Sequence, residues 1–105
     1  DYTDFEIQFN RTFSLINEIV PNGAFKRYTD GRFKGKFLES AFEAISVGIS
    51  KNFASYDLPA DNDFIKNKIE NLHQDATFIR YTGSGSNART RIPNIIPFAI
   101  DYFSK

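Results

Sequence analysis

The stretch FLESAFEAISVGIS, residues Phe37–Ser50, decides the fold of this chain. At helical spacing its polar residues fall on one narrow stripe, and the rest of the circumference is apolar or small. A helix that is apolar around most of its circumference is typical of a domain interior. We therefore predict a central buried helix over about residues 37–51. Ala41, Ala44 and Gly48 lie along one line of it, which predicts a second helix crossing at close range.

The composition indicates one small soluble-type domain with an aromatic core. The 105 residues include 12 Phe and 5 Tyr but no Trp, Met or Cys. This length is enough for a single core. The net charge of zero argues against a wholly basic nucleic-acid wrapper or a membrane-surface protein, although local patches stay possible.

The sequence lacks residues and segments that several classes of site and cellular location require. Without Cys, disulfides, thiolate metal sites and cysteine nucleophiles are excluded. No apolar run approaches the roughly 20 residues of a membrane span, and no signal peptide is apparent. We expect a cytoplasmic location and no membrane partner. Because the chain has no initiator Met, we expect residues 1–105 to be a single helical domain taken from a longer polypeptide.

The N-terminal segment has the pattern of an amphipathic helix. Thr3 and Glu6 are spaced as a capping box, with Thr3 as the N-cap. Apolar residues then recur every three or four positions, which favours a helix over the strand that the alternation at its start would also allow. This stripe comprises Phe5, Phe9, Phe13, Ile16 and Val20. We expect the helix to end at Pro21–Gly23.

The segments on either side of the central helix are less regular. Residues 25–36 contain Asp30-Gly31, a dipeptide typical of tight turns, so either a short hairpin or a loop hugging the core fits. Residues 52–60 are expected to form a loop whose apolar side chains tuck back onto the core. Those side chains belong to Phe53, Tyr56 and Leu58.

Two further helices are expected after this loop. Asp61–Asp63 supplies cap-forming side chains and negative charge for the start of a third helix. Its buried stripe consists of Ile65, Ile69 and Leu72. A short fourth helix over about residues 75–81 directs Phe78 and Ile79 inward.

The last helix is predicted to start near Ser86 and to be interrupted. Its apolar side comprises Ile92, Ile95, Ile96, Ala99, Ile100 and Phe103. Pro93 and Pro97 each remove a backbone donor and clash with the preceding turn. We therefore expect a break at Ile92, a second helical piece that opens at Pro93, and a kink or an irregular turn near Pro97. The predicted fold class is mainly α, a compact bundle of about five helices around the central helix.

Few residues are suited to catalysis or metal binding. His73 is the only histidine, and we expect it to lie partly exposed on a helix surface. Glu39 and Glu43 lie one helical turn apart and could act as an acid/base pair or as metal ligands, but a solvated polar stripe is the favoured interpretation. Nothing forms a set of nucleophile, base and orienting group, so we expect no catalytic residue, metal or cofactor in this chain.

Two segments could bind anions. The Gly/Ser-rich loop at residues 82–86 leads into a helix and could hold an anion on its amides, but it lacks the Lys and the strand of a P-loop, so an ordinary connection is favoured. The loop comprises Thr82, Gly83, Ser84, Gly85 and Ser86. In the segment 26–36, basic residues alternate with rings that could stack on bases, although core rings with solvated charges fit better. The candidate phosphate contacts are Lys26, Arg27, Arg32, Lys34, Lys36, Arg80, Arg89 and Arg91.

A family resemblance is carried by Ala24–Arg27, Gly31–Phe37, Ser40–Ala44, Phe78–Ser86 and Arg91-Ile92. These stretches resemble the helical C-terminal half of GmrSD-type restriction and phage-defence proteins. Members of that family carry a ParB/sulfiredoxin-like N-terminal domain and act on modified phage DNA. The resemblance covers about residues 5–92.

The resemblance implies a non-catalytic helical subdomain that packs on the ParB-like domain of its parent protein and contacts DNA phosphates. The family's nucleotide-handling run, similar to Asp-Gly-Gln-Gln-Arg, and its HNH-type nuclease half are both absent from this chain. NTP-dependent cleavage of DNA would therefore belong to the parent protein. The alternative is a protein-interaction or structural module without a nucleic-acid role, anchored by exposed Phe and Tyr. A free-standing enzyme is the third and least favoured hypothesis.

Overall fold

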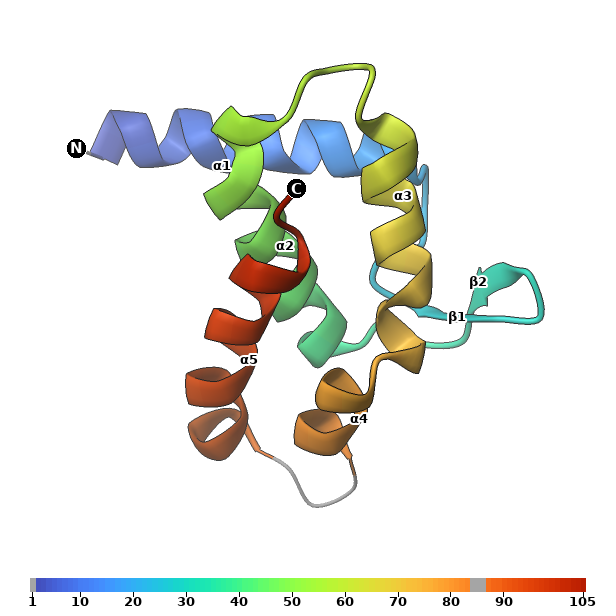
Figure 1. The fold of residues 1–105 in the computed structure, drawn as a ribbon. Coiled ribbons are helices and arrows are strands. Elements are labelled where there is room, and N and C mark those ends of the chain that lie inside the picture. Colours follow the sequence, from blue (N-terminus) through green and yellow to red (C-terminus); the bar gives the residue numbers. More distant parts are fainter. Residues whose placement is uncertain (1, 84–86) are drawn as a thin grey trace.

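The computed structural model describes residues 2–83 and 87–105 (Figure 1). These residues form five α-helices and one β-hairpin, joined by loops and turns. The helices are α1 (Tyr2–Ile19), α2 (Glu39–Asn52), α3 (Asn62–Asn71), α4 (Ala76–Thr82) and α5 (Ala88–Tyr102). The hairpin consists of β1 (Arg27–Thr29) and β2 (Arg32–Lys34). Short 3₁₀ turns follow α2 at Phe53–Ser55 and α3 at Leu72–Gln74. The predicted helical bundle is thus confirmed. None of the described helices is long and apolar enough to cross a membrane.

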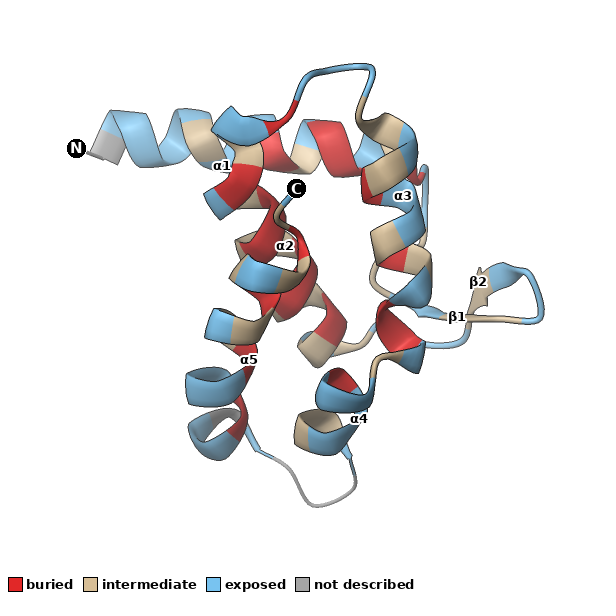
Figure 2. Ribbon diagram, viewed as in Figure 1, coloured by how far each residue is buried: buried red, intermediate tan, exposed pale blue. Residues whose placement is uncertain are grey.

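Helix α2 is the centre of the bundle, as its apolar circumference predicts. It packs most extensively against α5 and also contacts α1 (Figure 2). Its buried residues include Ala41, Ala44, Ile45, Gly48 and Ile49. The crossing with α5 is closest at Gly48, where an added Cβ would lie 2.8 Å from the carbonyl oxygen of Ala99 and collide with the ring of Phe103. The close helix crossing is therefore confirmed.

The central helix begins two residues later than predicted. The chain leaves the hairpin through Gly35, whose φ of +93° suits glycine. Leu38 is still extended, with φ −114° and ψ 119°, and its amide donates to the Phe25 carbonyl at 3.0 Å. The helix therefore starts at Glu39, and Phe37 is left 54 % exposed.

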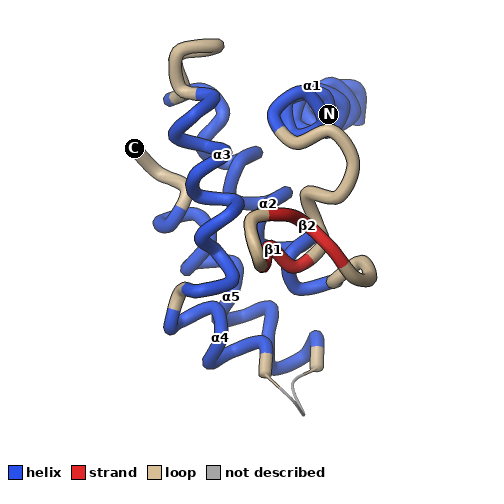
Figure 3. Tube along the Cα trace, turned by 90° about the vertical axis from the view of Figure 1, so that its right-hand side faces the viewer, coloured by secondary structure: helices blue, strands red, loops and turns tan. Residues whose placement is uncertain are grey.

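The hairpin alternative for residues 25–36 is confirmed. Asp30 and Gly31 have φ of +55° and +78°, the left-handed conformations of a type I′ turn. Tyr28 pairs with Phe33 across the strands, and their ring centroids are 4.8 Å apart. Phe33 packs against the core, so the aromatic side of the hairpin faces inward. Figure 3 shows the hairpin below α1, on the side of the molecule where the chain leaves that helix.

Helix α1 matches the predicted period, but only its second half is buried. Its C-terminal half adds Thr12, Leu15 and Ile16 to the core. The N-terminal turns project beyond the other helices in Figure 1, and Phe5 and Phe9 are exposed there. The prediction that Thr3 is the N-cap of a capping box is wrong, because Thr3 lies inside the helix rather than before it. The predicted end is confirmed by Asn22 and Gly23, whose φ values are +62° and +102°.

In the segment before α3, Phe53 and Tyr56 pack against the core as predicted. Tyr56 is buried and donates from its hydroxyl to the Phe103 carbonyl at 2.8 Å, and burial raises the pKa of this hydroxyl. Leu58 is exposed, so its predicted contact with the core is wrong. Helix α3 buries Ile65 and Ile69 as expected. Asp61 does not cap it; its carboxylate accepts the Asp57 amide at 2.6 Å instead.

Helix α4 begins where predicted and is capped by Asp75, whose carboxylate accepts the Thr77 amide at 2.9 Å and the Phe78 amide at 3.1 Å. Phe78 is buried, as expected. Ile79, which was expected to point inward, is exposed.

Helix α5 is continuous from Ala88 to Tyr102, which contradicts the predicted break at Ile92 and an irregular turn near Pro97. Asn87 caps it by accepting the Thr90 amide at 3.1 Å. Pro93 and Pro97 are both exposed and lie four residues apart, so they fall on the same side of the helix. The carbonyls that lose their helical partners therefore face water, and the buried side of the helix keeps its hydrogen bonds.

Candidate functional site

An apolar groove lies between the N-terminal half of α1 and the outer side of α2. It has a volume of about 340 Å³. Its walls are Phe5, Phe9, Phe13, Phe42 and Val47, and its polar lining is Gln8, Thr12, Ser46, Ser50 and Lys51. The Gln8 side-chain amide links the two helices beside the groove, because it donates to the Ser50 hydroxyl at 3.0 Å and to the Ser50 carbonyl at 3.4 Å.

The rings of this groove form one continuous series, which we call the aromatic strip. The strip consists of Phe5, Phe9, Phe13, Phe42 and Phe37, with ring centroids 4.5 to 6.3 Å apart from one neighbour to the next. Both of its ends are open to solvent, because Phe5 is 65 % and Phe37 54 % exposed. A contiguous apolar surface of this kind is typical of a protein interaction site.

The groove floor contains polar groups that the described part of the chain leaves without partners. The hydroxyls of Thr12 and Ser46 are buried there and make no hydrogen bond to any described residue. Buried polar groups of this kind normally find a partner. No local pattern of residues indicates this feature, because it depends on how α1 and α2 cross.

A second candidate surface is the outer face of the hairpin. The register pairs Arg27 with Lys34 and Thr29 with Arg32, so the three basic side chains share one face of the ribbon. The rings of Tyr28 and Phe33 occupy the other face. The basic and aromatic side chains of this segment are thus separated, as expected from core rings with solvated charges.

The basic face of the hairpin, defined by Arg27, Arg32 and Lys34, carries little compensating negative charge. Its only ion pair within residues 2–83 and 87–105 joins Lys34 to Asp30 at 2.9 Å. Arg27 and Lys34 are directly opposite each other, an arrangement that is destabilising for like charges. Lys36 joins these two residues in lining one shallow recess, whereas Lys26 is exposed nearby.

The other predicted phosphate contacts are not brought together with the hairpin. Arg80 and Arg89 are exposed on α4 and α5, and the Arg80 guanidinium lies 5.4 Å from the Tyr81 ring centroid. Of the glycine-rich loop, Thr82 donates to the Phe78 carbonyl at 2.6 Å and Gly83 is extended. Its remaining residues, Ser84, Gly85 and Ser86, lie outside the described residues.

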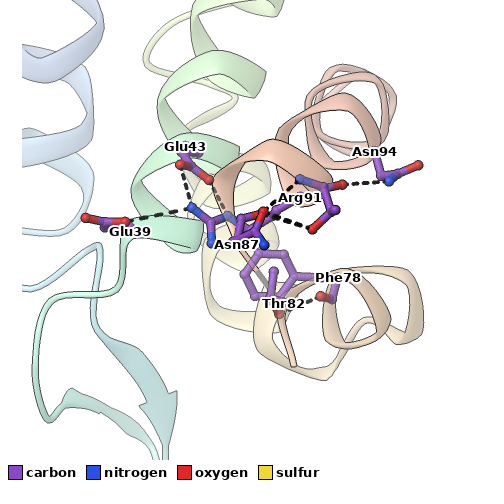
Figure 4. Close-up of polar contacts among 8 residues, drawn as sticks. Glu39, Glu43, Phe78, Thr82, Asn87, Arg91 and Asn94 are labelled. Atoms are coloured by element: carbon purple, nitrogen blue, oxygen red, sulfur yellow. Dashed lines mark hydrogen bonds and ion pairs between the residues drawn. The ribbon is translucent and has the colours of Figure 1, made fainter. Parts of the chain in front are cut away.

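Arg91, a predicted phosphate contact, has a structural role instead. Its Nε and Nη2 donate to Glu43 Oε1 and Oε2 at 2.7 and 2.9 Å, and Glu39 lies 3.8 Å away (Figure 4). The hydrogen bonds to Glu43 raise the pKa of Arg91. This buried pair occupies the guanidinium and the Glu43 carboxylate, which leaves neither free for a ligand. The sequence feature that indicates this buried position is the spacing of Arg91, which lies four residues before the buried Ile95 and thus on the inner side of α5.

His73 is buried, which contradicts the predicted exposed position. It lies in the 3₁₀ turn Leu72–Gln74, is only 8 % exposed and meets the edge of Phe78 at 5.8 Å between centroids. Burial is the main cause, and the Arg27 charge a further cause, of the lowered pKa of His73. The imidazole is therefore neutral at pH 7.

The described residues contain no group of three or more His, Asp or Glu side chains that could hold a metal ion. The sequence matches no known protein-family model, and no curated protein or solved structure is significantly similar to it. The relationship to GmrSD-type proteins therefore stays a prediction that depends on the short sequence motifs.

Proposed function

We propose that this chain is a cytoplasmic, non-catalytic helical subdomain that packs onto a neighbouring protein domain through the aromatic strip. The observation that carries the proposal is the apolar stripe of α1. Its second half is buried against α2, while the same stripe continues into the first half, where Phe5 is 65 % and Phe9 48 % exposed. Covering the two rings would contribute up to about 1.5–3 kcal/mol each.

The partner that we propose is the ParB-like domain of a GmrSD-type parent protein, which handles nucleotide or DNA. The support for this parentage is the sequence resemblance alone. The support for the mode of packing is the shape of the site, since a groove between two helices suits an amphipathic partner helix that inserts apolar side chains.

We expect the gene to encode a ParB-like domain before Asp1, and that domain, produced separately, to bind this chain. Phe5→Ser and Phe9→Ser should each weaken binding about 30-fold, measured by isothermal titration calorimetry, because each removes a ring worth about 2 kcal/mol on burial. Ile7→Ser is the matched control. Ile7 is also exposed and apolar but lies on the opposite side of α1, so its replacement should leave the affinity unchanged. Equal weakening by Ile7→Ser, or a gene without such a domain, would contradict the proposal.

A second candidate function is phosphate-backbone binding by the basic face of the hairpin. It is favoured by the direct opposition of Arg27 and Lys34, whose repulsion in the free protein would be relieved by an anion. Lys36 lies beside them at the same recess. In this function the subdomain contacts the DNA that its parent handles.

The double variant Lys34→Gln/Lys36→Gln should lower the salt dependence of duplex DNA binding. We expect the slope of log K against log salt to become shallower by about 2, because each lost phosphate contact removes about 0.9 from it. Fluorescence anisotropy with a labelled duplex between low and moderate salt measures this slope. Lys66→Gln, an exposed charge change on α3, should leave the slope unchanged. An unaltered slope in the double variant would rule out this role for the hairpin.

A further inference from the structure

We propose that His73 is a pH-sensitive latch, which ties the hairpin to the turn before α4 and opens in mild acid while the helices stay folded. His73 is the only histidine of the chain, which also has no cysteine. Histidine is the side chain whose ordinary titration lies between about pH 5 and 8. A structural change in this range therefore reports on one side chain. The latch depends on neither of the functions proposed above.

The latch joins two segments that lie far apart in the sequence. His73 lies in the 3₁₀ turn Leu72–Gln74, which connects α3 to α4. Its imidazole forms a hydrogen bond with the backbone of Lys26, the residue directly before β1. Arg27, the first residue of β1, lines a recess of about 150 Å³ together with His73. One side chain thus holds the base of the hairpin against the helices.

The surroundings of the His73 ring suit its neutral form. The residue is only 8 % exposed, and its ring lies edge-on to the apolar ring of Phe78. The Nε2 atom is buried and has no hydrogen-bond partner among residues 2–83 and 87–105. In the protonated ring both nitrogens are donors and the ring carries a charge. A buried charge without an acceptor costs far more than a buried lone pair, so protonation favours a state in which the ring reaches water.

Positive charge on the hairpin also opposes protonation. Arg27 makes no ion pair with any described residue. Its charge is the second cause, after burial, of the lowered pKa of His73. The hydrogen bond to the Lys26 backbone acts in the opposite direction, but the two other causes outweigh it. The Lys26 side chain is exposed and so adds charge that water screens.

No carboxylate in the described part of the chain forms an ion pair with His73. Glu39, at the start of α2, has 80 % of its side chain exposed and lies beside Arg91. Asp75, at the start of α4, accepts two amides of its own helix. Glu70, on α3, lies three residues before His73 without pairing with it. The remaining side chains that line the recess are uncharged, namely those of Leu38, Ser40, Phe78, Ile79 and Thr82.

Acid should therefore weaken the latch. In the latched state the pKa of His73 lies below its ordinary value of 6.5, and in the open state, where the ring is in water, it returns to that value. The open state binds more protons, so the latch is most stable above pH 6.5 and loses stability as the pH falls below this value. At a pH below both pKa values, each unit between them shifts the equilibrium towards the open state about tenfold.

An NMR titration of the isotope-labelled chain from pH 8 to pH 5 tests the latch. We expect the His73 ring to titrate with a midpoint below 6.5. The amides of Lys26 and Leu38, which are hydrogen-bonded at the base of the hairpin, should shift with the same midpoint. Nuclear Overhauser contacts between the His73 ring and Lys26 should disappear below it, which distinguishes release from protonation in place. The amide of Ile49, in the buried part of α2, and the helical circular dichroism signal should stay constant.

Three variants identify the groups responsible. Arg27→Gln should raise the His73 midpoint towards 6.5, because it removes the facing charge. Arg32→Gln is the matched control, since it removes an equal charge from the other strand of the hairpin but does not line the recess, and it should leave the midpoint unchanged. His73→Gln is neutral at every pH, so the amides of Lys26 and Leu38 should no longer titrate.

A His73 midpoint at or above 6.5, or an equal rise in Arg27→Gln and Arg32→Gln, would overturn the latch. Hairpin amides that stay constant while the ring titrates would overturn it as well. The same holds if the Ile49 signal and the helical circular dichroism are lost together with the hairpin signals, because acid would then unfold the whole domain. The comparison of Arg27→Gln with Arg32→Gln decides the matter even if His73→Gln fails to fold.

Discussion

Replacing Arg91 by alanine should destabilise the domain by about 3 kcal/mol, because it leaves a carboxylate buried without its partner. Glu43 has only 19 % of its side chain exposed, and both of its oxygens accept from Arg91, at 2.7 and 2.9 Å. The pair joins α2 to the first turns of α5. Urea denaturation followed by circular dichroism measures the change. Arg89→Ala, two residues earlier on the same helix and exposed, should change the stability by no more than about 0.5 kcal/mol.

A double-mutant cycle separates the attraction within the ion pair from the cost of leaving a buried carboxylate without its partner. Glu43→Leu/Arg91→Met replaces both charges by apolar side chains of similar length, and we expect it to recover most of the stability that Arg91→Ala loses. Recovery would indicate that the cost of the single variant arises from the stranded carboxylate rather than from the attraction within the pair. A loss below about 1 kcal/mol in Arg91→Ala would mean that water already reaches Glu43 and that the pair is a surface ion pair.

The elements that local patterns govern could be predicted from the sequence. The apolar circumference of residues 37–51 identified α2 and its crossing with α5, and Asp30-Gly31 identified the hairpin turn. The two prolines of α5 misled the prediction, because the rule that proline breaks helices ignores which side of the helix it occupies. Pro93 and Pro97 share an exposed side, so the lost hydrogen bonds cost little.

The candidate site could be predicted only in part, because it depends on contacts between distant segments. A helical period shows which side of α1 is apolar, but not that the chain covers only its second half. In the same way, the sequence places Arg91 among the candidate phosphate contacts, whereas in the structure it binds Glu43, 48 residues away. His73 is buried by Phe78 and lies near Arg27, which is a relation of three segments that no spacing in the sequence reveals.

Gly48→Ala should destabilise the domain by about 2 kcal/mol, although alanine is the better helix former. An added Cβ would lie 2.8 Å from the Ala99 carbonyl oxygen and would collide with the Phe103 ring. Phe103 is fully buried, so its ring has no free space to move into. Overpacking of this kind costs about 3 kcal/mol, and the gain in helix propensity offsets about 1 kcal/mol of it.

Gly83→Ala is the matched control for this substitution. Gly83 has a φ of −71°, which suits alanine, and among the described residues its added Cβ would meet only the Ile79 carbonyl oxygen, at an ordinary 3.6 Å. We expect Gly83→Ala to raise the free energy of unfolding by about 0.4–1 kcal/mol, because alanine restricts the unfolded chain without strain in the folded one. Opposite signs for the two variants in the same urea experiment would show that the close approach of α5, rather than glycine flexibility, requires Gly48. A neutral or stabilising Gly48→Ala would instead place α5 further from α2 and remove the tight crossing on which the centre of the bundle depends.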